Sequence, residues 1–324
     1  MTQMKQSSLT QPPHRWKAFA ALAKSGIVSL VVLSVGGGYL IGQSFEHQFD
    51  LIRFLKTLLG ILLLSAGSGA LNQVQERHID AKMPRTQNRP LPSGTISLNE
   101  AITFVGVTLT AGAILLSTID RVLLGLGIFA VLSYNGLYTL WWKRKMPFAA
   151  VPGAIPGALP ILMGYLAALP QPTLNLETSA AGYFLFALLF YWQMPHFWVL
   201  AMKYREDYAE GSIPTLPVAL GNEKTKAHIW IWGLGYIAIP LVAPGFLPAL
   251  GSLYMTLASL TSLWVLWEMN QFRRAAQPAT GTSKGWLRFF LAVNFSLIFY
   301  LIAMVVDLWW IYFLPEISNL PAYW

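Results

Sequence analysis

The sequence contains no cysteine, and it contains few charged residues for a chain of 324. The missing cysteine excludes disulfides and thiolate metal sites. Charged residues make up only 11% of the chain, whereas hydrophobic residues make up 55%. A soluble domain of this size needs more charge to remain dispersed, so the composition indicates an integral membrane protein.

Long apolar segments recur along the chain, and several reach the roughly 20 residues that a helix needs to cross a bilayer core. We predict an all-α polytopic membrane protein with about nine transmembrane helices and a cytoplasmic N-terminus. The expected spans lie at about 18–42, 52–74, 99–118, 122–142, 147–168, 179–201, 227–249, 251–267 and 289–313. Pro244, Gly245 and Pro248 interrupt the apolar run between the seventh and eighth spans, so totals of eight and ten are alternatives.

Lysine and arginine are distributed unevenly between the expected loops. With the N-terminus inside, all but Arg53, Lys56 and Arg121 of the 22 basic residues fall in inside segments, as expected for cytoplasmic loops. This topology explains the net charge of +8 without a nucleic-acid partner. We expect a cytoplasmic tail over 1–17, a transmembrane domain over 18–313 and a short external tail over 314–324.

Three oxygen-bearing side chains lie where the second expected span ends. Asn72, Glu76 and Asp80 have i, i+4, i+8 spacing and therefore share one helical face. Acidic residues near a span are costly unless paired, and this set of oxygens suits Mg²⁺, which takes further ligands from phosphates. Arg85 and Arg89 follow shortly and could bind a diphosphate. The alternative is an ordinary hydrated helix end.

A second polar cluster follows the sixth expected span. On a continuous helix, His196, Lys203 and Asp207 share a face. Asp207 could then complete a second metal site opposite Glu76 and Asp80. A single histidine inside a membrane is otherwise explained by an interhelical hydrogen bond.

The inside end of the fourth expected span carries Tyr138 and Lys143. Lys143 could reach a diphosphate, whereas Arg144 and Lys145 are explained as an anchor on the cytoplasmic side.

The fifth expected span carries Pro152, Pro156 and Pro160 at four-residue intervals. Such a helix must bend, and its freed carbonyls need partners or a cavity, which favours the wall of a pocket. Close packing through the neighbouring glycines is the simpler alternative.

Four segments form long motifs: NQVQERHIDAKMPRTQNRPLPSG at 72–94, LYTLWWKRKMPF at 137–148, PGAIPGALPILMGY at 152–165 and WQMPHFWVLAMKYREDYAEGSIPTLPV at 192–218. Together with a looser match at 23–42, they resemble the UbiA-type intramembrane prenyltransferases, and within that family the branch that farnesylates haem. The resemblance implies a nine-helix UbiA-type bundle around a lipid-accessible cavity, capped by cytoplasmic loops. It also implies transfer of a prenyl group from an allylic diphosphate with Mg²⁺.

The resemblance assigns roles to individual residues. It implies catalytic metal ligands at Asn72, Glu76, Asp80 and Asp207, and substrate-binding residues at Arg85, Arg89, Lys143, Tyr138, His196 and Lys203. Many relatives that prenylate aromatic rings have aspartate after the first asparagine, where this chain has Gln73, as expected of the haem branch. Lys203 replaces the first aspartate of the second motif, so Glu206 or Glu210 could substitute as a ligand.

The resemblance implies transfer of the farnesyl group of farnesyl diphosphate to the vinyl group of haem b. Water adds in the same reaction, giving haem O and diphosphate. His196, or alternatively His78, would contact the haem. The protein would lie in the lipid bilayer of a bacterial plasma membrane, with its site on the cytoplasmic side, and would pass its product to a haem A synthase or a terminal oxidase. An aromatic acid or quinone precursor is the alternative acceptor, and a membrane transporter is the alternative of another class.

Overall fold

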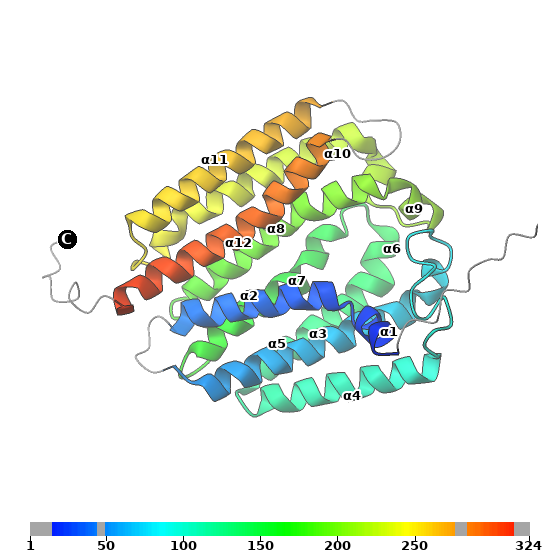
Figure 1. Cartoon of the computed structure of the whole chain (residues 1–324), viewed down its shortest axis with the longest axis horizontal. Helices are drawn as coiled ribbons and strands as arrows, with labels where there is room; N and C mark the ends of the chain where they lie inside the picture. Colours follow the sequence, from blue (N-terminus) through cyan, green and yellow to red (C-terminus); the bar gives the residue numbers. More distant parts are fainter. Residues whose placement is uncertain (1–14, 44–48, 276–283, 314–324) are drawn as a thin grey trace, which may run out of the picture.

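The chain folds as a bundle of long antiparallel helices (Figure 1). The computed structural model describes residues 15–43, 49–275 and 284–313, and these ranges contain helices and no strand. The first half comprises α1 (Arg15–Leu22), α2 (Ser25–Gln43), α3 (Leu51–Asp80), α4 (Leu98–Ser117), α5 (Arg121–Val131), the π-helix η1 (Leu132–Trp142), α6 (Lys143–Lys145) and α7 (Ala150–Ala168). The second half comprises α8 (Ala180–Lys203), α9 (Arg205–Glu210), α10 (Leu216–Ala238), the 3₁₀-helix η2 (Ile239–Gly245), α11 (Ser252–Arg274) and α12 (Lys284–Phe313).

Eight helices of the described ranges are long and apolar enough to cross a membrane, which confirms a polytopic membrane protein. The long helix α11 has 23 residues but is not among the eight. Its last turns carry Glu268, Arg273 and Arg274, which lower its apolar character. The total of nine spans therefore stays a prediction.

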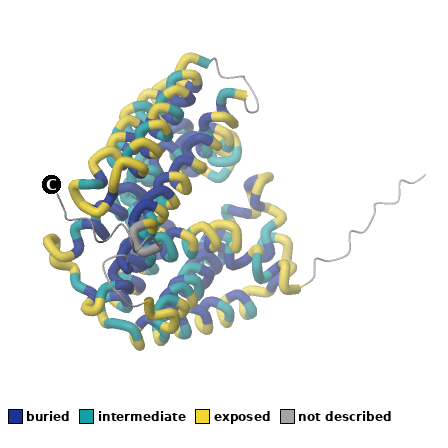
Figure 2. Tube along the Cα trace, turned by 60° about the vertical axis from the view of Figure 1, so that its left-hand side comes forward, coloured by how far each residue is buried: buried dark blue, intermediate teal, exposed yellow. Residues whose placement is uncertain are grey.

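Large apolar side chains cover the outer faces of the bundle, as expected where helices meet lipid rather than water. They include Ile27, Leu30, Leu33, Ile102, Ile128, Leu260, Leu263 and Ile302. Buried positions lie where the helices face one another, and exposed positions lie outside (Figure 2). The main core contains residues of most of the long helices, so the bundle packs as one body.

The expected interruption after the seventh span is confirmed. The helix α10 continues into η2, which ends at Gly245, and α11 begins at Ser252. Of the two expected tails, residues 1–14 and 314–324 lie outside the described residues. The last residues of the expected N-terminal tail, Arg15 to Lys17, already belong to α1.

The proline-rich helix α7 lies in the middle of the bundle. Pro156 and Pro160 are buried within it. Its Gly164 faces the carbonyl oxygen of Val35, where a Cβ atom would collide with the backbone of α2. The structure therefore favours close packing through small residues for most of this helix.

The connections that carry the predicted polar motifs gather at one end of the bundle. The short helices α1, α6 and α9 lie at this end together with the connection between α3 and α4 (Figure 1). The first helix is held there by Leu22, which packs in a small core with Ala70, Ile96 and Ala101. The segments that carry the predicted polar motifs therefore lie at the same end of the bundle.

Candidate active site

The last turns of α3 carry the first predicted cluster. Asn72, Glu76 and Asp80 are all buried, with Asp80 fully inaccessible. The helix ends at Asp80, and Thr86 donates a hydrogen bond from its hydroxyl to the Asp80 carbonyl oxygen at 2.8 Å. These side chains are therefore part of the packed interior, which excludes the hydrated helix end.

Each member of the cluster has a basic partner from another segment. Lys143 Nζ lies 2.6 Å from Glu76 Oε1, and Arg89 Nη1 lies 2.7 Å from Asp80 Oδ2. Lys24 Nζ donates to the amide oxygen of Asn72. Opposite charges thus neutralise the two buried carboxylates, which would otherwise be very unfavourable there.

One oxygen in this cluster has no protein partner. Asp80 Oδ2 accepts from Arg89, but Asp80 Oδ1 is buried without a hydrogen bond. A buried unpartnered carboxylate oxygen is costly and marks a place for a ligand or ion. With Glu76 and the Asn72 amide oxygen, it forms a set of hard oxygen donors, which fits Mg²⁺.

The π-helix η1 connects the cluster to the fourth span. Thr139 Oγ1 accepts from Asn72 Nδ2 at 3.0 Å, and Asn135 is tied to Ser68 and Gln75 of α3. The wider π turns are uncommon and often occur at functional sites. This network fixes which way the Asn72 amide points and leads directly into Lys143, the first residue of α6.

The second predicted cluster is arranged differently from the expectation. The helix is not continuous, because α8 ends at Lys203, and Tyr204 has non-helical dihedral angles before α9 begins. The prediction that His196, Lys203 and Asp207 share one helical face is therefore wrong. The reason is tertiary: α9 turns to lie beside the connection that carries Arg85, so that Asp207 and Tyr208 meet it.

Arg85, which lies in the connection after α3, contacts the second cluster. Its Nε lies 4.0 Å from Asp207 Oδ2, and its guanidinium stacks over the rings of Tyr204 at 4.6 Å and Tyr208 at 5.5 Å. Stacking on aromatic faces preorganises a guanidinium without consuming its hydrogen-bond donors. The donors of Arg85 remain available to a phosphate group.

Lys203 and His196 lie away from these carboxylates. The Lys203 ammonium lies over the Trp286 ring at 4.9 Å and the Tyr204 ring at 5.2 Å. His196 packs between Trp192 and Phe290, and its Nδ1 is buried without a partner.

The other candidate ligands lie at the surface. Glu206, Glu210 and His78 are exposed. Across the described part of the chain, no three His, Cys, Asp or Glu side chains come together as a ready metal site. A divalent cation at Glu76 and Asp80 would therefore need oxygens from its ligand as well, as Mg²⁺ commonly does.

Sequence reasoning missed Lys24, Thr139 and Tyr208. Lys24 was explained by topology alone, yet burial lowers its pKa to about 7, with Arg89 acting in the same direction. Tyr208 lies beside Lys143 and Tyr138 around a cavity of about 70 Å³. Thr139 lies in the π-helix η1, whose turns are wider than those of an α-helix. Ordinary α-helical periodicity therefore does not predict that Thr139 faces Asn72.

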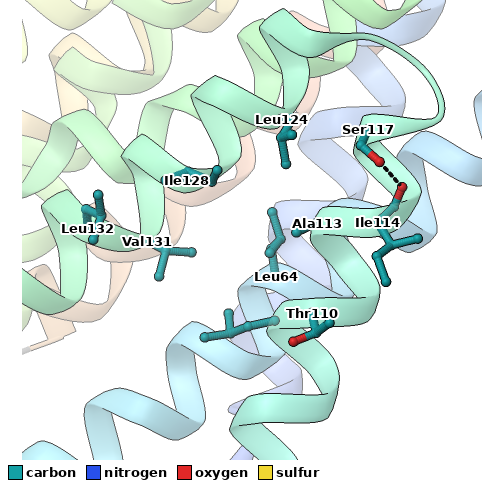
Figure 3. Close-up of a pocket in the computed structure, with 10 residues that line it drawn as sticks. Leu64, Thr110, Ala113, Ile114, Ser117, Leu124, Ile128, Val131 and Leu132 are labelled. Atoms are coloured by element: carbon teal, nitrogen blue, oxygen red, sulfur yellow. Dashed lines mark hydrogen bonds between the residues drawn. The ribbon is translucent and has the colours of Figure 1, made fainter.

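A larger groove of about 540 Å³ lies elsewhere, between α4 and α5. Figure 3 shows its apolar lining, with Ile114 and Ser117 on one side and Leu124 and Ile128 on the other. None of its lining residues is charged. Its size therefore does not make it the reactive centre, because it holds no group that could act on a diphosphate.

Comparison with known proteins adds a family to this geometry. Residues 29–294 match the UbiA prenyltransferase family. The chain is 46% identical over 294 residues to a protoheme IX farnesyltransferase of Bdellovibrio bacteriovorus, covering 90% of this chain and 97% of that protein. It is 41% identical over 249 residues to a protoheme IX farnesyltransferase of Aquifex aeolicus, covering 76% and 82%.

Solved structures share the fold at low sequence identity. A digeranylgeranylglyceryl phosphate synthase superposes with a TM-score of 0.72 at 19% identity, covering 91% of this chain and 98% of that one. A UbiA homologue from Archaeoglobus fulgidus bound to GPP and Mg²⁺ superposes with a TM-score of 0.60 at 17% identity, covering 89% and 99%.

Proposed function

Because the chain belongs to the UbiA prenyltransferase family, we propose that it transfers the farnesyl group of farnesyl diphosphate to the vinyl group of haem b, with addition of water. The products are haem O and diphosphate. The observation that carries this proposal is the 46% identity to a protoheme IX farnesyltransferase over 90% of the chain. The family assignment makes the protein a prenyltransferase, and the membrane spans make it a multi-pass membrane protein.

The donor half of the reaction belongs to the cluster at the end of α3. Asn72, Glu76, Asp80 and Asp207 would hold Mg²⁺ together with the diphosphate. The bound cation would neutralise charge on the phosphate oxygens. The unpartnered oxygen of Asp80 supports this assignment.

The basic residues then act on the leaving group. Arg85, Arg89 and Lys143 each pair with a different one of these carboxylates and would stabilise the negative charge that develops as the C–O bond to the farnesyl carbon breaks. Tyr138 lines the cavity beside Lys143 and would donate to the same oxygens. The apolar bundle excludes bulk water from the farnesyl cation until it meets its acceptor.

The acceptor half follows from the chemistry of a vinyl group. Its terminal carbon attacks the farnesyl cation and forms a C–C bond, which leaves a cation on the carbon next to the porphyrin. Water adds there and loses a proton, so the group gains farnesyl and hydroxyl. His196 and Lys203, which lie on the α12 side of α8, would contact the haem, with His78 as the alternative to His196.

The location and partners belong to the same proposal. The site end would face the cytoplasm of a bacterium, where soluble farnesyl diphosphate is available, because most basic residues lie in the segments at that end. Haem O would be handed on to a haem A synthase or a terminal oxidase.

The test is incubation of the purified chain with haem b, farnesyl diphosphate and Mg²⁺, followed by mass analysis of the haem. We expect a haem heavier by farnesyl plus water, and no product when EDTA removes the metal. Turnover with an aromatic acid such as 4-hydroxybenzoate, but not with haem b, would contradict the acceptor. Farnesyl-independent flux of a solute through proteoliposomes would contradict the enzyme class.

A further inference from the structure

Lys24 occupies an unusual backbone position between α1 and α2. Its φ is +56°, and among the described non-glycine residues only Ser212 also has a positive φ. The left-handed conformation raises the free energy of a residue that has a side chain. It therefore persists only where the surrounding structure imposes it, often at functional sites.

The surroundings that impose this turn come from α3. Gln73 Nε2 donates to the carbonyl oxygens of Ala21 at 2.8 Å and Leu22 at 2.9 Å. Gly69, one helical turn earlier, lies directly under the turn: a Cβ atom there would lie 3.1 Å from Ala23 O and 3.7 Å from the Lys24 Cδ atom. The residues that flank Asn72 on α3 therefore shape the turn that delivers Lys24 to it.

The Lys24 side chain ends inside the reactive cluster. Its ammonium donates to Asn72 Oδ1, while Asn72 Nδ2 is committed to Thr139. The amide oxygen is the one atom of Asn72 that can bind a cation. Glu76, Asp80, Arg89 and Lys143 all lie within electrostatic reach of the Lys24 ammonium.

We propose that Lys24 is a further substrate-binding residue and that Gln73 is the residue that positions it. In the substrate-free protein, Lys24 holds the Asn72 amide oxygen. When that oxygen binds Mg²⁺, the ammonium is displaced by like-charge repulsion and donates to the diphosphate instead. This inference rests on the proposed function, because it requires a diphosphate with Mg²⁺ at Asn72.

The exchange gives Lys24 two effects of opposite sign. Without diphosphate, the ammonium competes with a divalent cation for the amide oxygen and weakens cation binding. With diphosphate, the ammonium adds a charge-assisted hydrogen bond and strengthens binding of the complex. A lysine that only supported the fold would move both affinities in the same direction.

The test uses the full-length protein in detergent and measures Mn²⁺ binding by electron paramagnetic resonance, alone and with unreactive farnesyl thiodiphosphate. In Lys24→Met, we expect Mn²⁺ alone to bind several-fold more tightly and the thiodiphosphate to bind roughly tenfold more weakly. Lys24→Arg should retain most of the thiodiphosphate affinity. Lys17→Met, which changes an exposed lysine of α1, should leave both affinities unchanged.

Gln73→Met separates the positioning role from direct contact. It should weaken thiodiphosphate binding in the native background but have little further effect in Lys24→Met, because the turn then has nothing to deliver. If the affinities for Mn²⁺ alone and for the thiodiphosphate both fall in Lys24→Met, or if neither changes, the inference is overturned. The proposed function stays intact in that case, provided that the native protein binds both normally. A native protein that binds no thiodiphosphate would overturn both.

Discussion

Two regions of this bundle hold their buried polar groups in different ways. In the lobe of α10, α11 and α12, the hydroxyls pair with one another: Tyr236 with Ser296 and Tyr300 with Ser262, both at 2.8 Å. At the end of α3, the buried groups are carboxylates and an amide held by lysine and arginine. The hydroxyl pairs are neutral, whereas the cluster at the end of α3 depends on charges brought from distant segments.

The difference separates packing from chemistry. Neutral hydroxyl pairs satisfy their hydrogen bonds at little cost and strengthen contacts between membrane helices. Of the two buried acids in the described part of that lobe, Glu268 pairs with Arg288 at 2.6 Å, and Asp307 accepts from the backbone N–H of Gly251. At the end of α3, one carboxylate oxygen of Asp80 stays unpartnered. Because burying an unpartnered carboxylate oxygen costs free energy, a cluster that retains one is arranged to bind a ligand.

The largest expected effect comes from Asp80→Asn. Loss of this carboxylate should lower kcat/KM for haem farnesylation by roughly 1,000-fold, because a ligand for the cation on the leaving group is lost. Glu268→Gln is the matched change in the other lobe and should keep activity within about threefold. Both are measured by haem O formation in membranes with equal protein levels. Similar activity losses in the two variants would remove the distinction between the regions.

Asp207→Asn should follow, with a loss of roughly 100-fold or more in kcat/KM, measured in the same assay. The proposed reason is that Asp207 supplies the carboxylate opposite α3 and orients Arg85. Glu210→Gln, an exposed position on the same short helix, is the control and should be close to normal. If Glu210→Gln were the damaging change, the second metal ligand would be Glu210.

Lys143→Met should lower kcat by roughly 100-fold, because one donor to the developing negative charge is lost. Arg144→Met removes the neighbouring charge, which is exposed, and should change kcat by less than about twofold. Steady-state kinetics with varied farnesyl diphosphate distinguishes the two. Equal losses would mean that the basic run acts only as a positive anchor.

The smallest expected effect comes from Tyr236→Phe. It removes the hydrogen bond between Tyr236 and the Ser296 hydroxyl, which keeps its bond to the Val293 carbonyl. The loss should lower the free energy of unfolding by about 1 kcal/mol, with kcat/KM unchanged. Thermal unfolding in detergent measures the first and the haem assay the second. A large loss of activity at native-like stability would place this hydroxyl pair in the chemistry.

Much of the fold was predictable because apolar runs of membrane length have few alternatives. The expected spans at 179–201 and 147–168 correspond to α8 and α7, and the interruption near Pro244 was recognised from proline and glycine. The interruption at Tyr204 was not recognised, because neither proline nor glycine marks that position. There the chain turns because α9 packs against the Arg85 segment, and no local pattern contains that information.

The sequence by itself determined which residues could do the chemistry and that Asn72, Glu76 and Asp80 share a face, since helical periodicity is local. Only the tertiary structure decided their partners. Lys24 and Asn72 are 48 positions apart, and Lys143 and Glu76 are 67 apart, so helix packing alone brings them together. The role of Lys24 depends wholly on this packing. In the sequence, its charge indicates only the topology, and it becomes part of the site because the turn before α2 packs against α3.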